Sequence, residues 1–166
     1  KLDVPDIAAL ANVAKEKNVV FVVDNTVTTP LLLQPKKLGA DIVIHSTSKF
    51  INGHGNAIGG IVVDCGTFDW SSPRYSQLRP FYKRAGNMAF LAYLRNQVCR
   101  DLGGCLSPFN AFLMSIGIES LGVRMERHCA NAMQLAQHLQ GHPKLERVVY
   151  PFLPDHPDLE LAKRQM

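Results

Sequence analysis

Two short apolar segments, each followed by polar side chains, constrain the fold of this chain more than any other feature. Residues 19–23 form the first segment and end at Asp24, and residues 41–44 lead into a glycine-rich loop that contains Lys49. Continuous runs of β-branched apolar residues predict strands that are buried on both faces of a sheet. We therefore expect Asp24 and Lys49 to lie at strand ends, where open α/β sheets bind ligands.

Helix and strand patterns alternate around these two segments. Apolar residues at helical spacing predict a helix over residues 6–17, with Asp3 or Asp6 at its start. A short helix over residues 31–38 separates the two strands, and residues 57–64 form a third strand. This alternation is typical of βαβ units, so we expect an α/β fold with a parallel sheet.

The second half of the sequence is mainly helical. We predict a loop over 65–80, a helix over 81–102, a helical stretch over 107–139, a short strand over 145–150 and a final helix over 158–165. Ser107 is expected to cap the long stretch, and Gly117 and Gly122 weaken its middle, so that it bends or breaks there. We place a domain boundary in this stretch, with residues 1–120 in one domain and residues 121–166 as a connecting helix and the beginning of a second.

The composition excludes several classes of protein. The 166 residues are 46% hydrophobic and 19% charged, as in globular proteins and unlike disordered ones. The net charge is +4, but the basic residues are scattered, so we expect no nucleic-acid partner. Apolar runs are far shorter than the roughly 18–20 residues that span a bilayer, and the amino end does not resemble a signal peptide. The four cysteines lack CxxC spacing, which favours free thiols and a cytoplasmic location.

The polar residues at the strand ends match the needs of pyridoxal phosphate. Its aldehyde needs a lysine amine, which Lys49 supplies, and its ring nitrogen needs a carboxylate, which Asp24 supplies. Its phosphate needs hydroxyl and amide donors, and Ser46 and Ser48 lie on the same loop as the lysine. Histidines flank this loop, but no carboxylate or cysteine stands at ligand spacing, so we predict no metal site.

Longer motifs resemble those of one enzyme family. Residues 22–26, 38–55, 106–112, 117–121 and 124–128 together are similar to the signature of the cystathionine gamma-synthase-like enzymes of cysteine and methionine metabolism. The resemblance covers nearly the whole chain, and its motifs occur in the right order. It implies the central part of a fold-type I, aspartate aminotransferase-like large domain with a parallel-rich sheet, running into a smaller C-terminal α+β domain. It also implies a homotetramer built as a dimer of dimers.

The resemblance assigns roles to five residues. Lys49 is implied to be the Schiff-base lysine, Asp24 the partner of the pyridine nitrogen, and Thr26 a residue that lies against the cofactor. Ser46 and Ser48 are implied to be phosphate ligands; Ser48 stands where the family usually has threonine, which keeps the hydroxyl group.

Within the family, the chain is most similar to the O-acetylhomoserine sulfhydrylases. The implied reaction is γ-replacement, in which acetate leaves an activated homoserine and sulfide or a thiol takes its place, giving homocysteine or methionine. Asn52 departs from this branch, which usually has glycine at that position. Cystathionine gamma-synthase or gamma-lyase activity and methionine gamma-lyase activity therefore stay open as alternatives.

The chain also lacks parts that the resemblance implies. It does not begin with methionine, and we expect it to be a segment of a longer protein. Neither the aromatic residue that stacks on the cofactor nor the arginine that binds the substrate carboxylate is present. If these 166 residues are the whole protein, we predict a non-catalytic scaffold that holds the cofactor from one side only.

Overall fold

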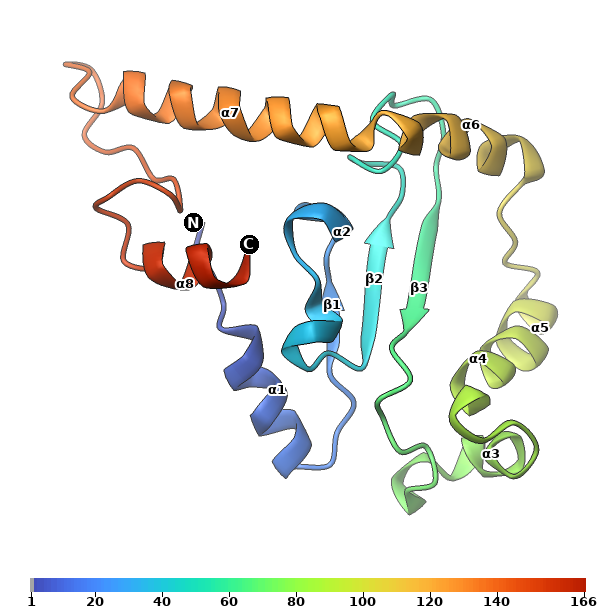
Figure 1. The fold of residues 1–166 in the computed structure, drawn as a ribbon. Coiled ribbons are helices and arrows are strands. Elements are labelled where there is room, and N and C mark those ends of the chain that lie inside the picture. The colour runs from blue at the N-terminus through green and yellow to red at the C-terminus, as the bar shows by residue number, and fades with distance from the viewer. Residues whose placement is uncertain (1) are drawn as a thin grey trace.

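Three strands form one sheet in the order β1–β2–β3 at the centre of the computed structural model, which describes residues 2–166 (Figure 1). The elements of this half are α1 (Ile7–Glu16), β1 (Val22–Asp24), α2 (Thr29–Leu32), the 3-10 helix η1 (Pro35–Leu38), β2 (Ile42–Ser46) and β3 (Gly60–Asp64). The predicted helix over 6–17 is confirmed as α1. As expected, Asp6 caps its start, because the Asp6 side chain accepts a hydrogen bond from Ala9 N.

The directions of the strands differ in part from the expectation. β1 and β2 are parallel, with Asp24 opposite Ile44, but β3 runs antiparallel to β2. The expectation of parallel pairing as far as the third strand is therefore wrong for β3. A parallel return needs a crossover connection, usually a helix, and residues 47–59 form turns and a loop instead.

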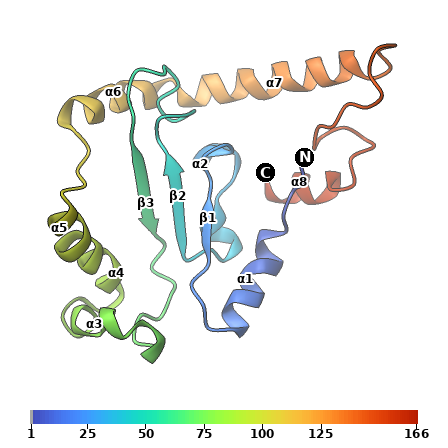
Figure 2. The ribbon, with the colours of Figure 1, turned by 180° about the vertical axis from the view of Figure 1, so that it is seen from behind.

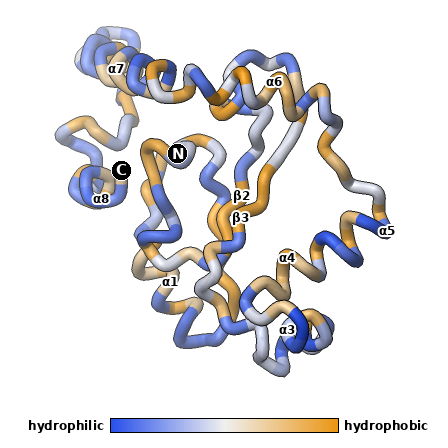
Figure 3. Tube along the Cα trace, turned by 45° about the vertical axis from the view of Figure 1, so that its right-hand side comes forward, coloured by the Kyte–Doolittle hydropathy of each residue, from blue (hydrophilic) through white to orange (hydrophobic). Residues whose placement is uncertain are grey.

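Burial is also less uniform than the apolar strand sequences predicted. Ile42 and Val43 of β2 are buried, whereas Val22 of β1 and Val62 of β3 are 46% and 42% exposed. Burial on both faces thus holds only for the central strand, because β1 and β3 are the two edges of the sheet in the described part of the chain. Figure 3 shows the apolar residues along β2 and β3.

The predicted helix over 81–102 has the expected extent but is interrupted. It consists of α3 (Arg79–Ala85), the 3-10 turn η3 (Gly86–Met88), α4 (Ala89–Tyr93), the π-helical turn η4 (Leu94–Cys99) and α5 (Arg100–Leu102). The predicted loop before it contains a further 3-10 helix, η2 (Pro73–Leu78). Trp70 stacks on Phe90 of α4 at a centroid distance of 5.2 Å, which packs these short helices against the side of β2 that carries Ile42.

Two long helices, α6 (Pro108–Glu119) and α7 (Leu121–Leu139), pass over the end of the sheet where β2 finishes (Figures 1 and 2). The Ser107 hydroxyl caps α6 by accepting from Asn110 N at 3.1 Å, as predicted. The chain breaks between the helices at Ser120, which lies between the two glycines that weaken the stretch. This break falls at the proposed domain boundary, but the division into two domains stays a prediction.

The last part of the chain returns toward the first. The predicted strand over 145–150 is wrong, because this segment has irregular backbone with a single bend, whereas the final helix is confirmed as α8 (Leu159–Gln165). The two ends of the chain lie near each other, beside α8 (Figures 1 and 2). Within residues 2–166, no helix combines the length and the apolar character that crossing a membrane requires.

Candidate active site

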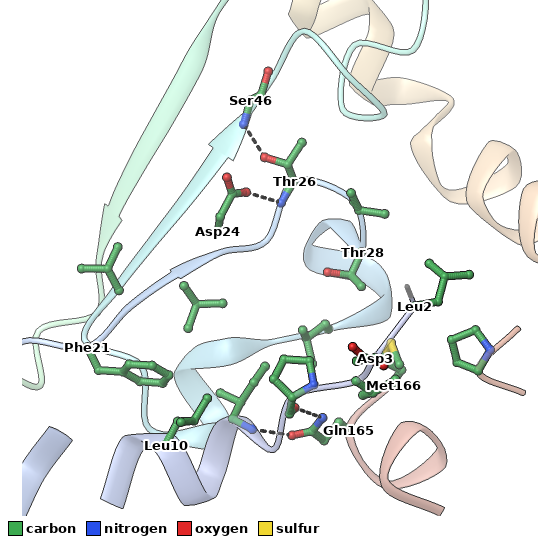
Figure 4. Close-up of a pocket in the computed structure, with 18 of the residues that line it drawn as sticks. Leu2, Asp3, Leu10, Phe21, Asp24, Thr26, Thr28, Ser46, Gln165 and Met166 are labelled. Carbon is green, nitrogen blue, oxygen red and sulfur yellow. Dashed lines mark hydrogen bonds between the residues drawn. The ribbon is translucent and has the colours of Figure 1, made fainter. Parts of the chain in front are cut away.

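A cavity of about 840 Å³ lies beside the end of β1, and most of its wall is apolar. Four of the five predicted site residues line it: Asp24, Thr26, Ser46 and Lys49. Ser48 is not among the lining residues. Figure 4 shows Asp24, Thr26 and Ser46 grouped on one side of this cavity. The structure therefore brings the predicted carboxylate, amine and one hydroxyl to one place from two neighbouring strand ends, as parallel pairing of β1 and β2 predicts.

The Asp24 carboxylate stands at the end of β1 and is exposed. Its Oδ1 accepts a hydrogen bond from Thr26 N at 2.9 Å. Hydrogen bonds from the Thr26 hydroxyl and backbone N–H lower the pKa of Asp24 below its ordinary value. Asp24 is therefore a carboxylate anion at neutral pH, held in place by the residue two positions further on.

Thr26 has a second contact that sequence reasoning did not anticipate. Its Oγ1 accepts a hydrogen bond from Ser46 N at 2.8 Å, so it joins the turn after β1 to the end of β2 (Figure 4). Thr26 thus bonds to both Asp24 and Ser46 and links the turn that carries the carboxylate to the end of β2. The expected contact of Thr26 with a cofactor stays a prediction.

Asn25 organises the turn that follows Asp24, and the sequence motif gave no role for it. The Asn25 side chain is buried, and its Nδ2 donates to the carbonyl oxygens of Thr29 and Leu33, both at 3.0 Å. Its Oδ1 accepts from the Thr28 hydroxyl. Thr29 is fully buried with φ +58°, a left-handed conformation that strains a β-branched residue, so this network must hold it there.

Lys49 lies one turn beyond the end of β2. Its backbone N–H donates to Ser46 O at 3.3 Å, and its carbonyl oxygen accepts from Gly53 N at 2.7 Å. The side chain is exposed on the cavity, and among residues 2–166 its amine has no hydrogen bond or ion pair. The backbone is thus fixed at both sides of the residue, while the amine is available to a ligand.

The hydroxyl of Ser48 already has partners. Its Oγ accepts from Gly59 N at 2.9 Å and donates to Gly59 O at 3.2 Å, which links the lysine loop to the start of β3. A hydroxyl has one proton to donate, so binding a phosphate oxygen requires Ser48 to release the Gly59 carbonyl. The ligand role of Ser48 stays a prediction, with this rearrangement as its condition.

Two histidines near the loop have different surroundings. His45 belongs to β2 and is buried, and burial is the main cause that lowers its pKa, so the ring is neutral at pH 7. His54 is exposed, and its Nδ1 lies 2.6 Å from Asn52 O within the loop. No group of three His, Cys, Asp or Glu side chains in the described part of the chain has an arrangement that could hold a metal ion.

The opposite wall of the cavity comes from the two ends of the chain. Residues 2–5 line it together with Gln165 and Met166 of the C-terminal segment (Figure 4). The Gln165 side chain accepts from Ile7 N at 2.9 Å and donates to Pro5 O at 3.0 Å. These two hydrogen bonds hold α8 against the start of α1 and the residues just before it. The bonded residues are about 160 positions apart in the sequence.

Comparisons with known proteins agree with this geometry. A family described as "Cys/Met metabolism PLP-dependent enzyme" matches residues 1–166. An O-acetyl-L-homoserine sulfhydrylase from Leptospira meyeri is 45% identical over 99% of the chain and 41% of its own length. A cystathionine beta-lyase from Coxiella burnetii is 42% identical over 100% of the chain and 38% of its own length. The chain thus spans less than half the length of these relatives.

Two solved structures match the fold over 99% of the chain. An O-acetylhomoserine sulfhydrylase from the methionine biosynthetic pathway of Wolinella succinogenes has a TM-score of 0.89 and 45% identity, and the match covers 46% of that structure. A protein from Campylobacter jejuni described as an O-acetylhomoserine (thiol)-lyase has a TM-score of 0.90 and 34% identity, with 43% of it covered. The latter carries N'-pyridoxyl-lysine-5'-monophosphate. The fold is therefore that of fold-type I pyridoxal phosphate enzymes, and the chain corresponds to a part of it.

The residues on the cavity fit pyridoxal phosphate. In the described part of the chain, an exposed lysine amine with no hydrogen bond or ion pair, an ionised carboxylate and the serine that ends β2 border one apolar cavity. A cationic pyridine nitrogen suits the carboxylate, an aldehyde suits the amine, and the apolar wall suits an aromatic ring. The donor set for the phosphate is incomplete in this part of the chain, since Ser48 is engaged with Gly59.

Proposed function

Because this chain belongs to the Cys/Met metabolism PLP-dependent enzyme family, we propose that it forms one side of the active site of a pyridoxal phosphate enzyme that replaces the acetate of O-acetylhomoserine with sulfide or a thiol. The proposal rests on one observation above all: Asp24 and Lys49 line the same apolar cavity. When bound, the cofactor withdraws electrons from the amino-acid carbon skeleton. The similarity to the sulfhydrylases from Leptospira meyeri and Wolinella succinogenes supports the choice of reaction.

Each residue has a distinct part in this proposal. The Lys49 amine would hold the cofactor covalently, and as a free amine it would move protons at the substrate carbons. The Asp24 carboxylate keeps a proton on the ring nitrogen, and its lowered pKa favours the ionised form that this role needs. Ser46 donates to the phosphate, and Thr26 orients both Asp24 and Ser46.

A direct test offers the purified complete protein O-acetylhomoserine with sulfide, and separately O-succinylhomoserine, cystathionine and methionine. We expect homocysteine to form fastest from O-acetylhomoserine and sulfide. Lys49→Ala should lower this rate by at least about 10³-fold, since the covalent and proton-transfer roles both depend on the amine. Lys15→Ala is the control, because Lys15 is exposed on α1 and does not line the cavity. Faster turnover of cystathionine or methionine would contradict the proposal.

A second candidate is cystathionine lysis. The alignments with the Leptospira sulfhydrylase and the Schizosaccharomyces pombe homocysteine synthase extend over 182 and 176 positions, more than this chain has residues, so they contain gaps. The alignment with the Coxiella lyase extends over 166 positions, which is the length of this chain. The lyase therefore has no residues inserted relative to this chain, and this favours lysis as the second candidate. The substrate comparison above separates these two reactions.

We also propose a cytoplasmic homo-oligomer, which stays a prediction. The family resemblance, which implies a dimer of dimers, supports the oligomeric state, and the four free cysteines support the location. Sedimentation of the complete protein measures the oligomeric state, and a monomer that turns over substrate would contradict the proposal.

A further inference from the structure

Arg124 holds the loop that follows Lys49, although it lies 75 positions further along the chain. It belongs to the first turn of α7, directly after the break at Ser120. Its Nη1 donates to Phe50 O at 2.8 Å, and its Nη2 donates to Ile51 O at 3.3 Å. These carbonyl groups belong to the two residues that come immediately after the lysine.

The same guanidinium also binds the junction of α6 and α7. Its Nη2 donates to Gly117 O at 2.9 Å, and its Nε donates to Ser120 Oγ at 2.9 Å. Carbonyl groups in the last turn of a helix have no backbone partner within the helix, so side chains bind the Gly117 carbonyl, which accepts from Arg124 Nη2 and also from Ser120 Oγ at 3.2 Å. A planar guanidinium spreads its N–H donors over three nitrogens in a fixed geometry, whereas the three donors of a lysine ammonium share a single nitrogen and reach less far apart. Arg124 therefore connects the lysine loop to the helix junction.

Two glycines let the loop and the helices approach this closely. A Cβ at Gly53 would lie 2.2 Å from Arg124 Nη1, and Gly53 has φ +75°. A Cβ at Gly117 would lie 2.3 Å from Asn52 O, and Asn52 is fully buried between the two segments. The helix junction thus contacts loop backbone directly, and the loop follows any movement of the junction.

The loop also packs on this side through Ile51, which is buried in one apolar cluster with Leu121 and Met125 of α7. Two polar or aromatic contacts accompany this packing. Phe50 contacts His128 of α7 edge-on at a centroid distance of 5.5 Å, and Thr47 Oγ1 donates to Met114 Sδ. Both contacts are weaker than the charge-assisted bonds of a guanidinium to carbonyl oxygens. Arg124 itself is not among the residues that line the cavity, so its influence on Lys49 passes through the loop backbone.

We infer that Arg124 is a positioning residue that fixes the loop behind Lys49, and thereby the point from which the lysine amine enters the cavity. The inference rests on the proposed function, since it assigns Arg124 an effect on how fast that amine binds an aldehyde ligand. In that step the Lys49 nitrogen takes the place of the aldehyde oxygen, which leaves as water, with no change in oxidation state.

The experiment compares Arg124→Ala and Arg124→Lys with Arg127→Ala in the complete protein. Arg127 is a matched control, since it is exposed on the same helix, and none of its contacts in the described chain involves the loop. The first measurement is backbone hydrogen exchange of residues 49–56 without cofactor. The second is the rate at which pyridoxal phosphate becomes attached to Lys49, trapped with borohydride and located by mass spectrometry, over a range of pH.

We expect Arg124→Ala to speed exchange in the loop and to slow attachment roughly 10- to 100-fold, the effect of a misplaced reacting group. Arg124→Lys should lie between Arg124→Ala and the wild type, and Arg127→Ala should match the wild type. Equal attachment rates for the Arg124→Ala and Arg127→Ala proteins would overturn the inference. A wild-type protein that attaches nothing at Lys49 would overturn the proposed function instead, and the exchange data would still decide whether Arg124 holds the loop.

A second pair of variants covers the case in which Arg124→Ala does not fold. Gly53→Ala pushes against the guanidinium, whereas Gly55→Ala, at φ +64°, meets no atom within 4 Å. Both changes strain a left-handed residue, so only the collision with Arg124 differs between them. Slower attachment in Gly53→Ala than in Gly55→Ala supports the inference, and equal rates overturn it.

Discussion

Asp24 and Lys49 both stand beyond a strand end, but the structure supports them in different ways. The turn after Asp24 is held by its own neighbours and by the adjacent strand, since Asn25 bonds to Thr29 and Leu33 within eight positions and Thr26 accepts from Ser46 N of β2. The loop after Lys49 has local backbone bonds too, but it is also held from a distance, through contacts with Met114 and Arg124 that are 67 and 74 positions away. Local bonds form wherever the turn forms, whereas distant ones exist only when α6 and α7 are in place.

This difference predicts which changes damage each half of the site. Changes at the helix junction should displace the lysine loop and leave the Asp24 turn intact. Changes within the Asp24 turn should do the reverse. The following substitutions test that separation, in order of decreasing expected effect.

Gly117→Ala should have the largest effect, because a Cβ there would lie 2.3 Å from Asn52 O and 2.9 Å from Asn52 Cα. Overpacking against backbone that cannot rotate away should lower the free energy of unfolding by about 2–3 kcal/mol. Hydrogen exchange should quicken in residues 49–56 and stay unchanged in residues 24–33. Urea unfolding and exchange measured by mass spectrometry check both statements.

Gly122→Ala is the matched control, because nothing lies within 4 Å of its added Cβ on the exposed side of α7. Alanine is the better helix former, so this change should raise the free energy of unfolding by roughly 0.5–1 kcal/mol. If Gly117→Ala were as stable as Gly122→Ala, the close contact between α6 and the lysine loop would be contradicted.

Asn25→Ala should have the next largest effect. It removes the side chain that serves two buried carbonyl groups and the Thr28 hydroxyl, and leaves these groups without partners. We expect a loss of about 2 kcal/mol in the free energy of unfolding, measured in urea. Exchange should quicken in the Asp24 turn and not in the lysine loop; Asn131→Ala, at an exposed site on α7, should change neither. Faster exchange in both segments would show that the two supports are not separate.

Thr26→Val should have the smallest effect on stability and a specific effect on titration. Removing the hydroxyl should raise the pKa of Asp24 toward its ordinary value, as followed by NMR of the carboxyl carbon. Because the wild-type pKa is lowered on folding, Asp24 stabilises the protein above its unfolded pKa and loses this effect as pH falls through the folded one. The stability difference between wild type and variant should therefore be widest at neutral pH and shrink in acid.

The Asp41 carboxylate supplies a control for this titration. Thr67 Oγ1 donates to Asp41 Oδ1 at 2.7 Å and has no contact with Asp24, so Thr67→Val should leave the pKa of Asp24 unchanged. An unchanged pKa of Asp24 in Thr26→Val would contradict the role of the hydroxyl in orienting this carboxylate.

The sequence alone predicted the parts of the site that depend on local order. Apolar runs marked β1 and β2, and their polar ends identified Asp24 and Lys49, because strand ends at one edge of a parallel pair come together. Caps at Asp6 and Ser107 were predicted from side-chain chemistry within three residues. The engagement of Ser48 with Gly59 was not predicted, since no local pattern marks a partner eleven positions away.

Tertiary structure decided the direction of β3, the exposure of the edge strands, and the support of the lysine loop. An apolar strand has the same sequence pattern in either direction, and the connection before it sets which one forms. Arg124 occurred in a motif similar to a known family, but its four acceptors lie in two segments that only the folded chain brings together. Hydrogen bonds between distant segments depend on the relative placement of helices and sheet, and periodicity and spacing carry no information about that placement.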